Sequence, residues 1–171
     1  MERTGIYELG GKGVTIVGPD LELDSIAPDF TVIDNDWNDV KALESTTGKV
    51  RILAAVPSLS TGVCDRETRR FNEEAAALGE DVAVLTISHD LPFTQKNWCG
   101  AAGVERVKTL SDARDAEFGE KYGALIKERR ILRRAVFVVD RAGKVVYSDY
   151  MPALGDEPNY EDVIAAAKSA L

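Results

Sequence analysis

Hydrophobic and β-branched residues recur along this chain in short runs separated by polar turns, a pattern typical of strands. The clearest run, Val50–Val56, stops at Pro57, which cannot donate a backbone hydrogen bond to a sheet. Similar runs predict six further strands, near Ile6–Leu9, Val14–Val17, Phe30–Ile33, Val82–Ser88, Ala135–Asp140 and Lys144–Tyr150. Glycine-containing turns connect the first two of these at Gly10-Gly11 and the last two at Arg141-Ala142-Gly143, so each pair is expected to form a hairpin.

Four other segments carry apolar residues at helical spacing, which predicts helices over Gly62–Leu78, Phe93–Ala102, Asp112–Tyr122 and Tyr160–Ala170. Ser111 is the expected N-cap of the third helix. The order strand–helix–strand, closed by a hairpin and a last helix, predicts an α/β fold with a mixed central sheet and helices on both faces. No repeat or long linker interrupts the chain. Residues 1–171 are therefore expected to form one domain, in which residues 1–18 form an N-terminal hairpin.

Composition and charge narrow the range of functions. With 171 residues and 44% hydrophobic content, the chain is large enough to bury a core without disulfides or metals. Its net charge of −8 argues against nucleic acid and against anionic membrane surfaces as partners. No apolar run approaches the roughly 20 residues of a membrane span. The N-terminus lacks the basic-then-apolar order of a signal peptide, so we expect a cytoplasmic protein.

Cys64 is the first candidate for chemistry. It lies in the first turn of the helix expected over Gly62–Leu78, on the same stripe as Phe71, Ala75 and Leu78, so its thiol is expected to point inward. Unpaired N–H groups and the positive end of a helix favour a thiolate at this position. A buried cysteine is more often a small hydrophobic residue without a chemical role, so its neighbours must decide.

The residues before Cys64 favour the chemical interpretation. Pro57 ends the strand, Thr61 brings a hydroxyl within one turn of the sulfur, and Gly62 allows close approach of a ligand or backbone. Together they predict a pocket of N–H and O–H donors around a thiolate. Such a pocket suits a small, oxygen-rich substrate.

The second cysteine, Cys99, lies beside Trp98 on the helix after the strand Val82–Ser88. It is either a packed thiol or a resolving cysteine that condenses with an oxidised Cys64 sulfur. A disulfide requires the two Cα atoms to come within about 7 Å, which the sequence does not show. The absence of a Cys-x-x-Cys pair excludes a thioredoxin-type dithiol, and with His89 as the only histidine the chain lacks the ligands for structural zinc.

A candidate positive charge lies before the strand that begins at Ala135. Four arginines precede this strand, at positions 129, 130, 133 and 134. Arg134 directly adjoins the strand, where its guanidinium can reach the end of the sheet and face a thiolate. The spacing alone does not favour one arginine over the others.

Two further polar segments have simpler interpretations. His89, beside Asp90 at the end of a strand, is expected to be a loop residue or to lie on the rim of a pocket. The acidic segment Asp34–Asp39 lacks the glycine and glutamate of a calcium loop and is interpreted as solvated.

Three separated motifs resemble those of the peroxiredoxins, in the bacterial thiol peroxidase branch often called atypical two-cysteine peroxiredoxins. The motifs are Pro57-Ser58-Leu59-Ser60-Thr61-Gly62-Val63-Cys64, Ser88-His89-Asp90-Leu91-Pro92-Phe93-Thr94-Gln95 leading to Cys99, and Arg134-Ala135-Val136-Phe137-Val138-Val139-Asp140. The resemblance extends over nearly the whole chain. The chain departs from the usual pattern at Ser60, His89, Trp98 and the segment Asp34–Asp39, which bears on substrate preference more than on chemistry.

The resemblance implies a thioredoxin fold and a peroxidase that reduces hydrogen peroxide and organic hydroperoxides. It implies that Cys64 is the peroxidatic cysteine, that Cys99 is the resolving cysteine, and that Thr61 and Arg134 activate and position the peroxide. The implied substrate-binding residues are Pro57, Thr61, Gly62, Val63 and Arg134. It also implies recycling by thioredoxin, a homodimer, and no metal or organic cofactor.

Two other functions remain open on the residues alone. The same two cysteines suit a peroxide-sensing redox switch that acts on a protein partner. A thioredoxin-fold binding module with inert thiols is the third hypothesis. Because both cysteines lie in expected helices, we expect at least one helix to unwind locally before a disulfide forms.

Overall fold

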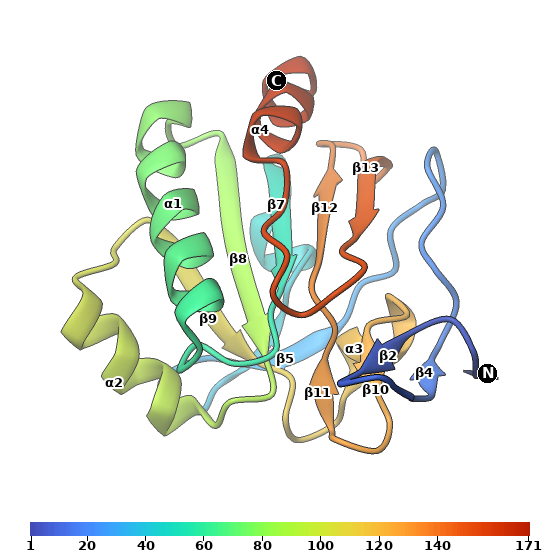
Figure 1. Cartoon of the computed structure of the whole chain (residues 1–171). Helices are drawn as coiled ribbons and strands as arrows, with labels where there is room; N and C mark the ends of the chain where they lie inside the picture. Colours follow the sequence, from blue (N-terminus) through green and yellow to red (C-terminus); the bar gives the residue numbers. More distant parts are fainter.

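A seven-stranded mixed sheet forms the centre of the computed structural model, which describes residues 1–171 (Figure 1). The strand order is β13-β12-β7-β8-β9-β5-β6, with β7, β8 and β9 parallel and the remaining pairs antiparallel. The strands are β5 (Thr31–Ile33), β6 (Asp39–Lys41), β7 (Val50–Ala55), β8 (Val82–Ser88), β9 (Val107–Ser111), β12 (Ala135–Val139) and β13 (Val145–Tyr150). The predicted mixed sheet is confirmed.

Helices cover both faces of this sheet, because its central strands are apolar on both sides. The helices are α1 (Gly62–Leu78), α2 (Pro92–Ala102), α3 (Glu117–Lys121), α4 (Tyr160–Ser169) and the 3₁₀ turn η1 (Glu44–Thr46). In β7, Ile52 packs toward α1 and α4, while Leu53 packs toward α3 on the other face. No helix is both long enough and apolar enough to cross a membrane.

The N-terminal segment reverses direction at Gly10 and Gly11 as expected, but the second predicted strand, Val14–Val17, is wrong for this hairpin, because Ile16 and Val17 pair with β1 (Glu2–Arg3) and β10 (Leu125–Ile126) instead. Strand β2 (Glu8–Leu9) pairs with β3 (Lys12–Gly13) across Gly10 and Gly11, both of which have positive φ, as a two-residue hairpin turn requires. A separate four-stranded ladder has the order β1-β4-β10-β11. Its strands are β1 (Glu2–Arg3), β4 (Ile16–Val17), β10 (Leu125–Ile126) and β11 (Ile131–Leu132).

The expected helix over Asp112–Tyr122 is wrong in its first half. Only Glu117–Lys121 is helical, and Ser111 ends strand β9 instead of capping a helix. The Asp112 carboxylate accepts hydrogen bonds from the backbone N–H groups of Phe118 and Gly119, and so caps the short helix from a distance. Strand β9 was not predicted, and neither were β6, β10 and β11.

The parallel strands bring the cysteine motif to one edge of the sheet. The loop after β7 leads through Pro57 into α1, and the loop after β8 leads through Asp90 into α2. Strand β12 runs antiparallel to β7, with Ala135 paired to Ala55. Arg134, one residue before Ala135, therefore lies at the same edge as the start of α1.

Candidate active site

Cys64 lies in the first turn of α1, as predicted, and Thr61 is the N-cap of this helix. Thr61 has extended backbone geometry, and its Oγ1 accepts a hydrogen bond from the Cys64 N–H at 3.4 Å. The Thr61 hydroxyl donates its own hydrogen to the Ser58 carbonyl at 3.1 Å. Cys64 itself is fully buried and packs in a small apolar cluster with Val56, Leu59 and Trp98. The thiol points inward, as predicted.

Arg134 contacts the sulfur directly. Its Nη2 donates to Cys64 Sγ at 3.2 Å, and the side chain is almost wholly buried. Two hydrogen bonds to the Leu154 carbonyl, at 3.1 Å from Nε and 2.8 Å from Nη2, fix the plane of the guanidinium. Arg133 instead packs over the Tyr150 ring. Of the four arginines, Arg134 is the one that the fold brings to Cys64.

Glu67 is a member of the site that sequence reasoning missed. Its Oε2 accepts from Arg134 Nη1 at 2.5 Å, whereas its Oε1 is buried without a hydrogen-bond partner. Burial raises the pKa of Glu67 from its usual 4.5 to about 7, against the opposing attraction of Arg134. The signal was present in the sequence, because Glu67 lies between Cys64 and Phe71 on the inward stripe of α1, where a carboxyl group needs a partner.

The raised pKa of Glu67 gives a testable pH dependence. Between about pH 4.5 and 7 the folded chain keeps the proton that the unfolded chain has lost, so stability falls as the pH rises through this window. Glu67→Gln cannot lose a proton there. From pH 5 to 8, we expect the free energy of unfolding of wild type to fall relative to this variant by about 2–3 kcal/mol, measured by urea denaturation. Parallel pH profiles for the two proteins would contradict the assignment.

Asp90 joins the two loops at this edge of the sheet. Its carboxylate accepts from Ser58 Oγ at 2.7 Å, from the Leu59 N–H at 2.8 Å and from Ser88 Oγ at 2.7 Å. Ser58 also hydrogen-bonds to Ser60. The Asp90 carboxylate therefore fixes the loop that leads to Thr61 and Cys64.

The remaining predicted substrate-binding residues lie around the start of α1. Pro57 is buried, Val63 is half-buried, and Thr61 and Gly62 are exposed. His89 lies in the loop between β8 and α2, which confirms the first of its two predicted positions. Its side chain is only 6% exposed, and its ring nitrogens lie 2.7 Å from the Arg130 carbonyl and 3.1 Å from the Asp112 carboxylate.

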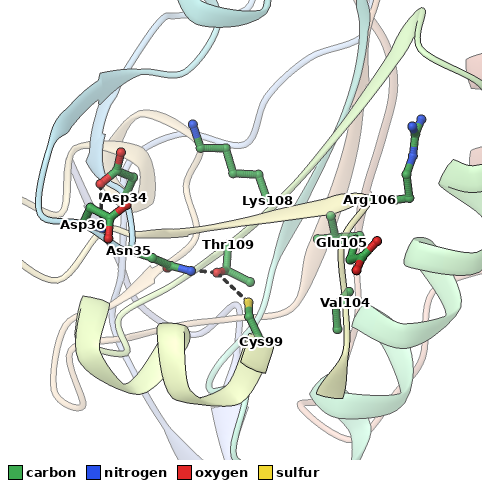
Figure 2. A pocket seen from close by; sticks show the side chains of 10 residues that line it. Asp34, Asn35, Asp36, Cys99, Val104, Glu105, Arg106, Lys108 and Thr109 are labelled. Carbon is green, nitrogen blue, oxygen red and sulfur yellow. Dashed lines mark hydrogen bonds between the residues drawn. The ribbon is translucent and has the colours of Figure 1, made fainter. Parts of the chain in front are cut away.

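Cys64 and Cys99 are both free thiols, and their side chains contact different residues. Cys99 lies near the end of α2, with Sγ 3.2 Å from the Thr109 hydroxyl on β9 (Figure 2). It faces a hollow of about 490 Å³ lined by residues 34–36, Cys99 and residues 104–109. Both cysteines lie in helices, as predicted, and we expect at least one of these helices to unwind locally before a disulfide forms.

Comparison with known families identifies the chain. It matches the family described as Redoxin over residues 22–164. The chain belongs to the Redoxin family. The chain is 55% identical to the thiol peroxidase of Bacillus subtilis over 159 residues. The aligned residues cover 93% of this chain and 94% of that protein. It is 48% identical over 159 residues to the thiol peroxidase of Staphylococcus aureus strain MRSA252, covering 93% and 95%.

Solved structures of other proteins share this architecture. A peroxiredoxin-like protein from Aquifex aeolicus superposes with a TM-score of 0.87 at 39% identity, covering 99% of this chain and 98% of that one. A thiol peroxidase from Chromobacterium violaceum superposes with a TM-score of 0.82 at 22% identity, covering 95% of each chain, and supports the fold alone. The predicted thioredoxin fold and the resemblance to peroxiredoxins are confirmed.

Proposed function

We propose that this Redoxin-family chain is a peroxidase that reduces hydrogen peroxide and organic hydroperoxides with Cys64. The observation that carries the proposal is the hydrogen bond from Arg134 Nη2 to Cys64 Sγ, with 3.2 Å between the two atoms. Cys64 lies in the first turn of α1. A fixed guanidinium and a positive helix end both favour the thiolate, which is the nucleophilic form of cysteine. The identity to proteins named thiol peroxidase supports the same conclusion.

In the proposed first step, the Cys64 thiolate attacks one peroxide oxygen, and the O–O bond breaks. The sulfur and the attacked O–H group become a sulfenic acid, while the other oxygen leaves as hydroxide or alkoxide and takes a proton from solvent to give water or an alcohol. Arg134 stabilises the negative charge that develops on the leaving oxygen. The two hydrogen bonds to the Leu154 carbonyl hold Arg134 in place, so little reorganisation is needed when the charge appears.

We propose that Thr61 orients the peroxide by accepting a hydrogen bond from it. Its hydroxyl hydrogen is directed to the Ser58 carbonyl, so the free lone pair on its Oγ1 is available for the O–H of the substrate. Pro57, Gly62 and Val63 are the other residues that we propose to contact the peroxide, because they flank Thr61 and Cys64 in the chain. Because Cys64 is fully buried, its neighbours must shift before a peroxide can reach the sulfur.

In the proposed second step, the Cys99 thiol attacks the sulfenic sulfur of Cys64. A disulfide forms and water leaves, which balances the reaction. We propose that thioredoxin then reduces this disulfide, that residues 1–171 act as a single domain, and that two copies form a homodimer. A reducing compartment such as the cytoplasm would keep both cysteines as thiols between turnovers.

Replacing Cys99 tests the two-cysteine mechanism. Cys99→Ser is expected to consume one equivalent of hydrogen peroxide and then to stop, because no second thiol resolves the sulfenic acid. Trapping with dimedone, followed by mass spectrometry, should place the adduct on Cys64. Wild type provides the matched control, and continued turnover of Cys99→Ser with thioredoxin would contradict the resolving role.

A further inference from the structure

The acidic loop between β5 and β6 is exposed to solvent over residues 36–39, as the sequence suggested, and its backbone forms a hydrogen-bonded turn. The Asp34 carboxylate accepts hydrogen bonds from the N–H groups of Asp36 and Asn38, both at 2.9 Å. These bonds support Trp37 in the left-handed region at φ 66°, which bulky residues seldom adopt. The turn thereby holds an indole ring out toward α2.

Two direct contacts connect this turn to α2, and a third reaches the helix through Thr109 on β9. The Trp37 ring packs against Phe93 with centroids 5.1 Å apart. Asp36 accepts from Lys96 at 2.8 Å. Asn35 accepts from the Thr109 hydroxyl at 3.2 Å, and that hydroxyl contacts Cys99 Sγ (Figure 2). We call residues 35–37 the α2 clasp.

Helix α2 has few other attachments to the core. Only Pro92 and Gln95 are buried along its length, and Gly100 weakens its last turn. On the side facing α1, Trp98 packs against the Cys64 cluster and donates to Asp65 at 2.9 Å. The α2 clasp thus holds the Cys99 thiol beside β9, while the neighbouring residue Trp98 contacts the Cys64 cluster.

We propose that Trp37 is a positioning residue for the resolving step, because the α2 clasp controls how often the last turn of α2 opens. This proposal rests on the proposed function, in which Cys99 must leave Thr109 and meet the sulfenic acid of Cys64. Trp37 and Phe93 are 48% and 64% exposed, so their contact can break without opening the core. A tighter clasp lengthens the life of the sulfenic acid, and a second peroxide then oxidises it to sulfinic acid with loss of water or alcohol.

The first experiment measures opening without peroxide. In a Cys64→Ser background, Cys99 is the only thiol, and its rate of alkylation by iodoacetamide reports its release from the α2 clasp. Trp37→Ala should raise this rate roughly three- to tenfold, since an aromatic contact is lost. Trp37→Phe should restore most of the protection. Asp39→Asn is the matched control, because Asp39 pairs with Arg114 and makes no contact with α2.

The second experiment measures resolution with both cysteines present. After one equivalent of hydrogen peroxide, Trp37→Ala should form the Cys64–Cys99 disulfide faster than wild type and should yield less sulfinic acid at excess peroxide. Equal alkylation rates for Trp37→Ala and Asp39→Asn would contradict the proposal that the α2 clasp restrains Cys99. Faster alkylation with an unchanged rate of disulfide formation would overturn its control of resolution. If no variant forms a disulfide at all, the proposed function fails, whereas the alkylation result still decides whether the clasp exists.

Discussion

Replacing Cys64 by serine is expected to lower the rate of peroxide reduction by at least about a thousandfold, to the background of the uncatalysed reaction. A serine hydroxyl is not ionised near neutral pH and cannot form the sulfenic acid, even with Arg134 and Thr61 in place. Coupled turnover with thioredoxin and thioredoxin reductase measures the loss.

Two comparisons make the Cys64→Ser result specific. Cys99→Ser is the matched control for loss of a thiol, and it should still consume one equivalent of peroxide. The unfolding midpoint in urea should change little in Cys64→Ser, because serine nearly matches the thiol in size. A Cys64→Ser protein that reduces peroxide at the wild-type rate would contradict the proposed nucleophile.

Removal of the Arg134 guanidinium is expected to have the second-largest effect on peroxide reduction. It should lower both the rate of Cys64 oxidation and the stability of the protein. Arg134→Met removes the donor to Cys64 Sγ, which we expect to lower the rate of oxidation by hydrogen peroxide about 100- to 1,000-fold. It also leaves the buried Glu67 carboxyl without its partner, at a cost of about 3–5 kcal/mol in unfolding free energy above pH 7. The pKa of Arg134 is raised because Glu67 and Cys64 outweigh the lowering effect of burial.

A double variant separates these two effects. Arg134→Met with Glu67→Gln removes the unpaired carboxyl, so it should recover most of the lost stability and none of the lost reactivity. Stopped-flow tryptophan fluorescence gives the oxidation rate, and urea titration gives the stability. If the double variant recovered peroxide reactivity together with stability, Arg134 would have a structural role alone.

The local parts of the site could be predicted from the sequence. The inward thiol follows from the helical spacing of Cys64 and Phe71, whereas the hydrogen bond from the Cys64 N–H to Thr61 is known only from the structure. Arg134 could not be chosen among four arginines, because its position depends on the pairing of β12 with β7. Glu67 lies on the inward stripe of α1, but the hydrophobic spacing that defines this stripe does not show whether a charged residue on it has a buried partner.

The errors in the fold have physical causes as well. Strand β9 was missed because Lys108 and Thr109 interrupt its apolar run, although its pairing with β8 in the parallel sheet stabilises it. The helix after it was drawn too long, since the spacing of apolar residues does not reveal that Asp112 caps a helix beginning at Glu117. The packing of Trp37 on Phe93 joins residues far apart in sequence, which no local pattern indicates.

The central claim is that Cys64 and Cys99 form one redox pair, and disulfide mapping tests it most directly. The reduced protein is treated with one equivalent of hydrogen peroxide, alkylated and digested with trypsin without reductant. The account predicts that the peptides Ile52–Arg66 and Asn97–Arg106 are recovered joined by a disulfide, and that thioredoxin releases them. Recovery of both peptides with alkylated thiols after exposure to peroxide would contradict the account.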